Sequence, residues 1–532
     1  MRDIFIGGAW PYANNSLHLG HLVALFPGDI VARYYRLKGD NVIYVSGTDS
    51  HGTPITIRAK KENVDPSVIV DKYHEEYISN FNDLDFSYDL YASTEDDEHK
   101  KMVKEYFLKL KENGYIYEKE ELEDYCETCN EFLSDREIEG ICPNCGKLTR
   151  GEEQCENCLS PISGKDLTDK KCKICGSNTT TKNNKHLYFA LSKFQDDLQE
   201  YVNDNSKYWR KNAINESQKY LTMGLIDRAT TRELDWGVEV PIDGYEDKRI
   251  YVWIEAVLGY LTTGRRVAEK KGIDFDKFIS NSNPNLSTYY AHGKDNIIFH
   301  TIIFPALLMG LKNNYQLPKY ILSSEYLNIN NQKMSKSKGG LITINEMLEK
   351  YNSDSIRYYA IANGPEKKDI NFSEEDFIQV HNKFLVGVYG NFVNRNLSFI
   401  SKKFDNNIPN GIVDPSIIEV TIKAYEEVGN AIEKGELRYA LERAIDYINL
   451  GNKYYDENAP WIKVKEDIEA FNNITYTCVY MIANISNLLN PFVPKSTNKI
   501  KEMLNLSSAK WEVINLKKDM KINNLSILFE RI

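Results

Sequence analysis

The sequence lacks the uninterrupted apolar run of about 18 residues that a membrane-spanning helix needs. Its most apolar stretch, Ile297–Leu311, is interrupted by a histidine, a threonine and a proline, and is predicted to form a buried helix. The N-terminus passes from Met1-Arg2-Asp3 straight into an apolar stretch, without the basic region or cleavage site of a signal peptide. These absences predict a cytoplasmic protein that does not contact a membrane.

Positive charge is also in deficit, because 66 Lys and Arg residues face 77 Asp and Glu residues, for a net charge of −11. This balance argues against a non-specific coat for nucleic acid, although local basic patches could still bind one folded RNA. Internal repeats are absent apart from paired cysteines. The 532 residues, 42% hydrophobic and 27% charged, are enough for several globular domains.

Eight of the nine cysteines form four Cys-x-x-Cys pairs. Close pairs in a long chain without a signal peptide indicate metal binding, and two such turns give the closed four-thiolate shell of structural zinc. The alternative is a cluster of buried or redox-active thiols, and the spacing leaves open whether one or two ions bind. The middle pairs are the first choice for one site and the outer pairs for a nested second site: Cys142, Cys145, Cys155 and Cys158, then Cys126, Cys129, Cys172 and Cys175.

The arrangement of predicted elements indicates a parallel α/β sheet. A strand is expected over residues 3–8, a helix over Leu19–Leu37 and a strand over residues 41–47. The segment from 118 to 182 is polar and cysteine-rich, and needs metal ions to fold. The α/β pattern then resumes, with a strand over 250–253, a helix over 255–271 and a strand over 287–292. Beyond residue 354, long amphipathic helices predict a bundle.

Two motifs suit ATP. His18-Leu19-Gly20-His21 lies where the first loop enters the first helix, whose N–H groups attract phosphate. Lys333-Met334-Ser335-Lys336-Ser337 is a basic loop whose ammonium groups could neutralise a departing pyrophosphate. Alone, the first is typical of a chance match or a weak metal site, and the second of a solvated charged loop. Their joint occurrence favours ATP.

With these motifs in this order, the chain resembles the class I aminoacyl-tRNA synthetases and, more closely, the methionyl-tRNA synthetase family. The further matches are "AWPYAN" at 9–14, "GTDSHGTP" at 47–54, "YVWIEAVLGY" at 251–260, "HGKDNIIFH" at 292–300, "NFVNR" and "ENAPW". The resemblance implies that methionine attacks the α-phosphate of Mg²⁺-bound ATP to give methionyl-adenylate. The methionyl group then passes to the 3′ end of initiator and elongator tRNA(Met).

The resemblance also implies roles for residues. His18, Gly20 and His21 would hold ATP, and Lys336 would contact its phosphates with help from Lys333. Asp49 would pair with the methionine ammonium group, and Arg232 would lie near that carboxylate. The side-chain pocket would comprise Ala9, Trp10, Tyr12, Trp253, Ala256, Tyr260 and His300, and the readers of the CAU anticodon would be Asn391, Arg395 and Trp461.

These roles compete with simpler ones: Asp49 as a turn cap, Trp253 and Tyr260 as core residues, and Trp461 as a partly buried helix-boundary residue. Two positions depart from the family pattern: Trp10 stands where leucine is expected, and Asn296 where some members have isoleucine. Because the chain ends soon after the predicted bundle, a monomer is expected.

The predicted fold is therefore a Rossmann-like parallel-sheet catalytic core split by a zinc-knuckle insert, followed by an all-α anticodon-binding bundle. The expected division is 1–117 and 226–325 for the core, 118–225 for the insert, 326–365 for the lysine loop and stem-contact segment, and 366–532 for the bundle.

The rival functions are another class I synthetase, for leucine, isoleucine, valine or cysteine, and a non-catalytic zinc-ribbon RNA-binding protein. Branched-chain synthetases usually carry a far larger insert, and the cysteine enzyme uses zinc within its active site.

Overall fold

The structure of the protein is a computed structural model. It describes residues 1–133, 137–150, 155, 157, 158, 162, 164–329, 332, 333 and 342–532, with only the backbone of 332 and 333. These residues form two compact units. The first contains Met1–Val103, Phe194–Leu225 and Val252–Ile532, and the second contains Lys104–Lys193 and Ile226–Tyr251. The domain boundaries expected from the sequence stay predictions.

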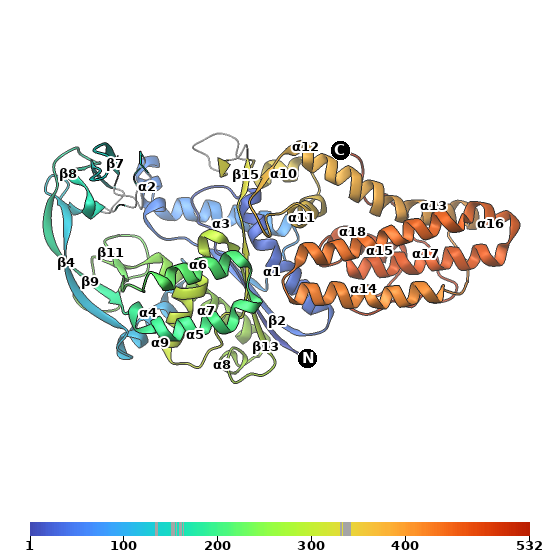
Figure 1. The fold of residues 1–532 in the computed structure, drawn as a ribbon, viewed down its shortest axis with the longest axis horizontal. Coiled ribbons are helices and arrows are strands. Elements are labelled where there is room, and N and C mark those ends of the chain that lie inside the picture. Colours follow the sequence, from blue (N-terminus) through green and yellow to red (C-terminus); the bar gives the residue numbers. More distant parts are fainter. Residues whose placement is uncertain are drawn as a thin grey trace. The chain divides into compact units, whose positions relative to one another are not determined.

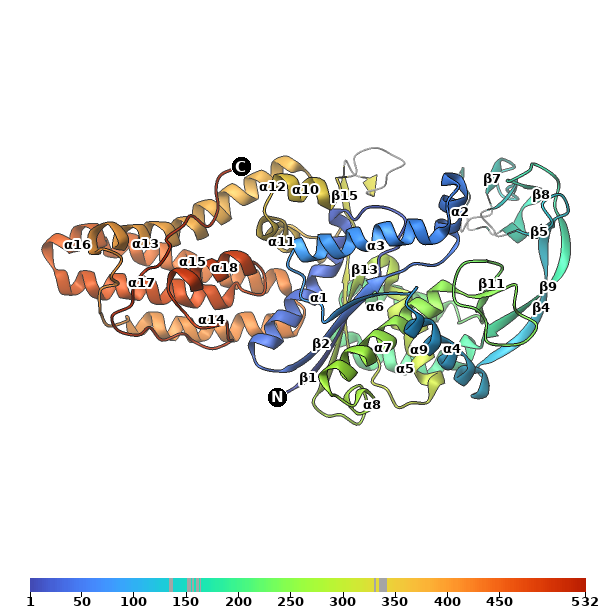
Figure 2. The same ribbon diagram turned by 180° about the vertical axis from the view of Figure 1, so that it is seen from behind.

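The first unit is built on a five-stranded parallel sheet with the order β14–β13–β1–β2–β3. The strands are β1 Asp3–Gly8, β2 Asn41–Thr48, β3 Leu90–Ser93, β13 Leu286–Gly293 and β14 Tyr320–Ser324. The central strands are buried almost throughout, because helices cover both faces of a parallel sheet. Figures 1 and 2 show α1 and α3 on one side of this sheet and α7 on the other. The predicted Rossmann-like core is confirmed.

The helices of this half of the chain lie in the segments between the strands. They are α1 Leu19–Leu37, α2 Thr53–Glu62, α3 Pro66–Asp83, α4 Asp97–Glu112, α5 Gln195–Asn205, α6 Lys211–Thr222, α7 Val252–Lys271, α8 Phe275–Phe278 and α9 Phe304–Leu311. Short 3₁₀ turns occupy Leu191–Phe194, Ser206–Tyr208 and Lys294–Asn296. The first helix has its predicted bounds, and Gly39 follows it with a φ of +77°, a conformation that favours glycine.

One predicted strand is wrong, and one predicted helix contains an irregular turn. The strand expected over 250–253 does not form, because β12 ends at Ile250 and α7 begins at Val252. Over only four residues, the apolar pattern of a strand and that of a fully buried first helical turn cannot be told apart in the sequence. The helix expected over 297–311 includes a π-helix, Phe299–Ile303, before α9. Pro305 has no N–H for the carbonyl of Thr301, and the widened turn accommodates this loss.

The segment Lys294–Leu311 is long and apolar enough to span a membrane, with a mean hydropathy of 1.2. However, 67% of it is buried inside the fold. A core helix of a globular protein has the same length and composition, and the prediction of a buried segment is confirmed.

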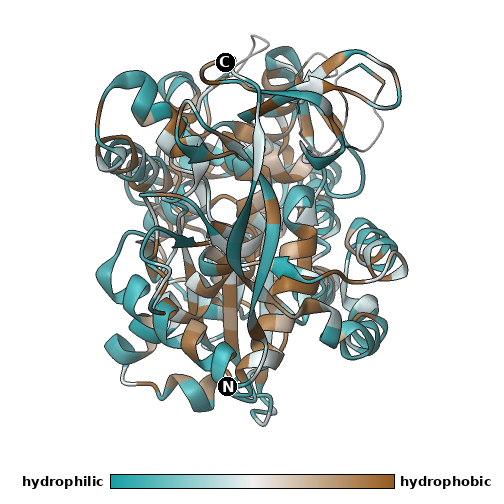
Figure 3. Ribbon diagram, turned by 90° about the vertical axis from the view of Figure 1, so that its left-hand side faces the viewer, coloured by the Kyte–Doolittle hydropathy of each residue, from teal (hydrophilic) through white to brown (hydrophobic). Residues whose placement is uncertain are grey.

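The second unit contains the cysteine pairs. Its main sheet has the order β10–β9–β4–β5, and β4 and β9 pair antiparallel over their whole length. Much of β4 is exposed, and the long ribbon is largely hydrophilic in Figure 3. The strands are β4 Ile116–Cys126, β5 Glu131–Phe132, β6 Ile138–Ile141, β7 Leu148–Arg150, β8 Thr168–Cys172, β9 Thr180–Phe189, β10 Arg228–Ala229, β11 Thr231–Arg232 and β12 Arg249–Ile250, with a 3₁₀ turn at Gly164–Asp166.

The remainder of the first unit is a small sheet, β16–β15–β17, followed by helices. The first part comprises β15 Leu327–Ile329, β16 Gln332–Lys333, α10 Ile344–Lys350, α11 Ser353–Ala362, β17 Ile370–Phe372, α12 Glu374–Val380 and a π-helix, His381–Gly390. The bundle that follows comprises α13 Asn391–Phe404, α14 Pro415–Glu433, α15 Leu437–Asn458, α16 Pro460–Glu466, α17 Ile468–Leu488 and α18 Pro494–Met503. Figure 1 shows α13, α14, α15 and α17 side by side, which confirms the predicted bundle.

Candidate active site

The two histidines of the first motif cap the N-terminus of α1. The Nδ1 of His18 accepts a hydrogen bond from the N–H of Gly20 at 3.1 Å, and the Nδ1 of His21 accepts one from the N–H of His18 at 3.2 Å. Because both Nδ1 atoms accept, each neutral imidazole carries its proton on Nε2. The ring centroids are 4.0 Å apart. Two N–H donors thus lie beside a helix N-terminus, where phosphate groups bind.

The described segment that follows the second motif pairs with the first motif. Lys336 is outside the described residues, and Lys333 is in β16, whose side chains are not described. The segment after the motif returns to the start of α1, where Thr343 pairs with His18 and the N–H of Ile344 donates to the carbonyl of Leu17 at 2.9 Å. The described segment that follows the lysine loop therefore lies beside the histidine pair.

Asp49 lies directly after β2 and is 4% exposed. Its main chain pairs with the loop that follows β1, because its N–H donates to Pro11 and its carbonyl accepts from Ala13, both at 2.9 Å. Burial and the negative charge of Glu255 raise the pKa of Asp49 well above its ordinary range. The N–H of His51 donates to Asp49 Oδ1 at 3.4 Å, which is the local turn contact expected of a capping aspartate.

A buried tyrosine–histidine pair lies at the same edge of the sheet. The hydroxyl of Tyr260 is 2.8 Å from His300 Nε2, and His300 Nδ1 donates to the carbonyl of Asn296 at 2.8 Å. Since Nδ1 is the donor, Nε2 accepts the tyrosine proton, and burial lowers the pKa of His300 to about 4. Both protons are thereby engaged within the protein. A thioether placed beside this pair would therefore meet the two aromatic rings, and such rings suit a polarizable sulfur.

The other predicted pocket residues lie on α7 and on the loop after β1. Trp253 is 39% exposed in the first turn of α7 and meets Phe299 edge-on at 4.7 Å, whereas Ala256 is buried. The N–H of Ala9 donates to the carbonyl of Ala291 at 2.9 Å, and this bond joins the loop after β1 to β13. The hydroxyl of Tyr12 lies beside Gly52.

Trp10, the departure from the family pattern, packs against two glycines. A Cβ on Gly47 or on Gly259 would overlap the indole ring. The ring is also 6.1 Å from the ring of His99, and its N–H has no hydrogen-bond partner among the described residues. The larger side chain is accommodated because neighbouring positions are small.

Arg232 belongs to the second unit, in β11. Its guanidinium carbon is 4.0 Å from the centroid of Tyr251, and Nη1 donates to the carbonyls of Ala229 and Thr231 at 3.2 and 2.8 Å. Stacking and two carbonyls hold the planar guanidinium in one orientation.

Four buried or partly buried side chains beside Asp49 were not predicted as functional: His51, Glu95, His99 and Glu255, here called the histidine–glutamate network. His51 lies between two carboxylates, with Nδ1 2.7 Å from Glu255 and Nε2 2.7 Å from Glu95. The second oxygen of Glu255 is 2.8 Å from His99 Nε2. One sequence signal existed, because Glu255 is a lone acid in an otherwise apolar helical segment.

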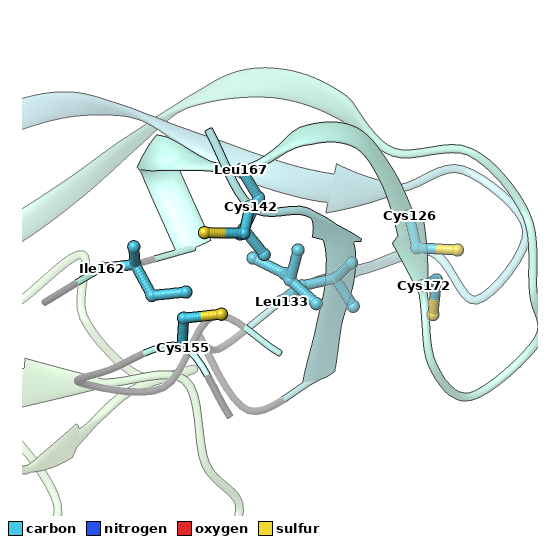
Figure 4. Close-up of a cluster of buried hydrophobic side chains, with 8 residues drawn as sticks. Cys126, Leu133, Cys142, Cys155, Ile162, Leu167 and Cys172 are labelled. Carbon is cyan, nitrogen blue, oxygen red and sulfur yellow. The ribbon is translucent and has the colours of Figure 1, made fainter. Parts of the chain in front are cut away.

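The eight paired cysteines form two separate groups in the second unit. Within each group the ligand atoms all lie within 4.8 Å of one another. Figure 4 shows Cys126 and Cys172 on one side of Leu133, and Cys142 and Cys155 on the other. The members are those expected: Cys142, Cys145, Cys155 and Cys158, and Cys126, Cys129, Cys172 and Cys175.

The spacing of the sulfurs fits zinc. Individual Sγ–Sγ distances are 3.4, 3.8, 3.8 and 3.7 Å. A tetrahedral shell with Zn–S bonds of about 2.3 Å has sulfur–sulfur edges of about 3.8 Å. Each group could therefore hold one Zn²⁺ with no position left for substrate.

The predicted anticodon readers gather along the helical bundle. The guanidinium of Arg395 lies 4.2 Å from the centroid of Tyr455, which meets Trp461 at 5.5 Å. Trp461 is 45% exposed, so a face of its ring is accessible to a base. Asn391, the first residue of α13, is exposed one turn before Arg395. Arg395 Nη1 also donates to Asp456 at 2.7 Å, which orients it.

Comparisons with known proteins agree with this architecture. Residues 4–397 match the family described as tRNA synthetases class I (M), and residues 414–527 match the anticodon binding domain of methionyl tRNA ligase. The fold and the site thus define a class I aminoacyl-tRNA synthetase.

Two curated relatives make the assignment narrower. Methionine–tRNA ligase 1 of Alkaliphilus oremlandii (strain OhILAs) is 49% identical over 530 residues, which cover 100% of this chain and 97% of the relative. The methionine–tRNA ligase of Streptococcus pneumoniae (strain CGSP14) is 48% identical over 532 residues, which cover 100% of this chain and 96% of the relative. This chain belongs to the methionine–tRNA ligase family, which confirms the resemblance seen in its motifs.

Solved structures agree on the fold. Mycobacterium tuberculosis methionyl-tRNA synthetase in complex with methionyl-adenylate has a TM-score of 0.83 and 23% identity, and the match covers 100% of both chains. At this identity the likeness supports the fold alone.

Proposed function

We propose that this chain activates methionine with ATP to methionyl-adenylate and transfers the methionyl group to the 3′ end of initiator and elongator tRNA(Met). The observation that supports the proposal is the main-chain pairing of residues 17–18 with residues 343–344, the segment that follows the lysine motif in the sequence. A triphosphate bound at the start of α1 would meet imidazole N–H groups and a helix N-terminus, and the lysines of the motif would approach it from the preceding part of that segment.

The chain's own groups act by positioning and by charge. The Nε2 protons of His18 and His21 would donate to ATP phosphates, and Lys336, with Lys333, would neutralise the charge that develops as pyrophosphate leaves. Asp49 would bind the methionine ammonium group through a charge-assisted hydrogen bond, and Arg232 would act near that carboxylate. The methionine carboxylate then attacks the α-phosphate, so no covalent bond to the protein is needed.

The thioether pocket would be lined by Ala9, Trp10, Tyr12, Trp253, Ala256, Tyr260 and His300. A sulfur placed against the Tyr260 and His300 rings gains from their edges and faces, while the buried rings exclude water. A hydroxyl or a charged group placed against these two rings would lose its hydration without gaining a donor from Tyr260 or His300, because the protons of both are engaged. This explains a preference for methionine over polar amino acids of similar length.

The two cysteine groups would each hold a structural Zn²⁺ through four thiolates, and Mg²⁺ would enter with ATP. Zinc would supply cross-links to a unit in which much of β4 is exposed. Asn391, Arg395 and Trp461 would bind the anticodon by stacking and by contacts to base edges.

The cytoplasmic location and the monomeric state stay predictions. Light scattering of the purified protein measures the oligomeric state.

Methionine-dependent exchange of pyrophosphate into ATP tests the proposal. The wild-type chain should show strong exchange with methionine, and Lys336→Ala should lose most of the rate with a modest change in methionine binding. Lys350→Ala is the matched control, because Lys350 lies after the motif and pairs at the surface with Glu374. Strong exchange with leucine and none with methionine would overturn the amino-acid assignment, and an unaffected Lys336→Ala rate would remove that lysine from its role.

A further inference from the structure

The histidine–glutamate network raises an electrostatic question about Asp49. The proposed function requires this carboxylate to be ionised, because only the anion pairs strongly with an ammonium group. Yet Asp49 is 4% exposed, and Glu255, whose side chain is fully buried, is a second negative charge close by. Two buried carboxylates cannot both remain ionised without a compensating cation.

His51 is placed to supply that cation. Both ring nitrogens face carboxylate oxygens at 2.7 Å, Nδ1 toward Glu255 and Nε2 toward Glu95. Carboxylates only accept hydrogen bonds when ionised, so both nitrogens are required to donate, and an imidazole that donates from both is an imidazolium. The main-chain N–H of the same residue donates to Asp49 Oδ1.

The energetics agree with the geometry. Burial opposes the imidazolium, but the charge and hydrogen bonds of Glu255 and Glu95 overcome it and raise the pKa of His51 to about 9. Burial likewise opposes ionisation of Glu255, and the charge of His51 nevertheless lowers its pKa. For Asp49, burial and Glu255 raise the pKa, and His51 is the one charged side chain that lowers it.

We infer that His51 is a positioning residue for methionine activation: held as a cation by Glu255 and Glu95, it keeps Asp49 ionised to receive the substrate ammonium group. This inference rests on the proposed function and assigns a role to a residue outside the substrate-contacting set. Asp49 and His51 are two positions apart on a loop that is bonded to the β1 loop, so the coupling between them is local.

Among the described residues, a small set of charged or titratable side chains faces Asp49 and His51 in the first unit. The charged or titratable groups that face Asp49 and His51 from the packed elements are Glu255 from α7, Glu95 from the loop after β3, His99 and Lys100 from α4, His74 from α3, and Tyr12 from the loop after β1. Lys100 pairs with Glu95 at 2.6 Å. Among these groups, His51 is the cation whose charge lowers the pKa of Asp49 and whose main-chain N–H donates to Asp49 Oδ1.

The test is the pH dependence of kcat/KM for methionine in pyrophosphate exchange at saturating ATP. In His51→Gln the acid limb, where Asp49 takes up a proton, should move at least one pH unit upward. On the acid side of the limb this displacement lowers kcat/KM tenfold, and activity should recover toward the wild-type value at alkaline pH. A loss that is the same at every pH would show a merely structural role and overturn the inference.

Two further variants separate charge from shape. His51→Lys keeps a positive charge without the ring and should leave the limb near its wild-type position; if it moves as far as in His51→Gln, the charge is not the cause. If His51→Gln does not fold, His51→Lys alone tests the inference, and a displaced acid limb in His51→Lys would overturn it. His74→Gln is the matched control, because His74 bonds Thr48 at 2.7 Å, one residue from Asp49, without a carboxylate partner at hydrogen-bond distance.

A binding measurement isolates the ammonium group. Calorimetric titration near pH 7 should show that His51→Gln binds methionine at least tenfold more weakly than the wild-type chain. The same variant should bind 4-(methylthio)butanoate, which lacks the amino group, with unchanged affinity. Equal losses for both ligands would contradict the inference, whereas absent exchange in the wild-type chain would instead refute the proposed function.

Discussion

Replacing Gly259 by alanine tests the account of Trp10. The new methyl would lie 2.6–2.9 Å from three atoms of the indole, inside van der Waals contact, so the ring or the helix must shift. Such overpacking costs about 1–3 kcal/mol. Against this, alanine in a helix interior is favoured over glycine by about 0.8–1.0 kcal/mol. The net expectation is a destabilisation of about 1 kcal/mol, with a higher KM for methionine if Trp10 lines the pocket.

The informative comparison is with Trp10→Leu, the residue that the family pattern favours. In that background the clash disappears and only the helix preference remains, so Gly259→Ala should now stabilise the protein by about 0.8–1.0 kcal/mol. Scanning calorimetry of the four proteins gives the coupling between the two sites. A sign reversal of the Gly259→Ala effect supports the reasoning; additive effects in the two backgrounds would refute it.

Three further predictions concern the zinc groups, the histidine–glutamate network and the bundle. Atomic emission should find two zinc ions per chain in the wild-type protein and one in Cys155→Ser, and the same content in both would contradict two independent four-thiolate sites. His51 has a folded-state pKa of about 9 against an ordinary 6.5. The contribution of the His51 charge to stability is therefore fully present below about pH 6.5 and is lost as the pH rises through about 9. The thermal midpoint of the wild-type protein should fall over this pH window, and that of His51→Gln should fall less. If the thermal midpoints of the two proteins change in parallel with pH, the raised pKa of His51 is contradicted. Trp461→Ala should raise the KM for tRNA(Met) in aminoacylation about tenfold, because stacking one base is worth about 1–3 kcal/mol; an equal loss in pyrophosphate exchange would instead assign the indole to the folding of the chain.

Much of the fold follows from local chemistry and was predictable for that reason. The bounds of α1 are set by a capping residue at one end and a glycine at the other, both visible in the sequence. The cysteine groups follow from tight Cys-x-x-Cys turns, because a turn brings its two thiols together whatever the rest of the chain does. The bundle follows from long amphipathic periodicity after residue 354.

The remainder depends on contacts between distant segments. Glu255 and His51 are 204 residues apart, and no local pattern pairs them. Whether 250–253 forms a strand or leads into a helix is decided by the pairing of β12 with β11 and by the burial of α7, not by the preferences of four apolar residues. Trp10 is likewise interpretable only once Gly47 and Gly259 are known to face it.

Main-chain bonds join the segments that carry the candidate active site. The loop between β1 and α1 is bonded to β13 through Ala9, to the end of β2 through both main-chain groups of Asp49, and to the segment after the lysine loop through Leu17. Peptide groups are unchanged by substitution, so variants of Asp49 or His51 should alter charge while the three segments keep their places. If His51→Gln loses activity on the acid side of the limb and has an unchanged thermal midpoint at alkaline pH, the loss therefore reports on electrostatics, because these main-chain bonds do not depend on the side chains of Asp49 and His51.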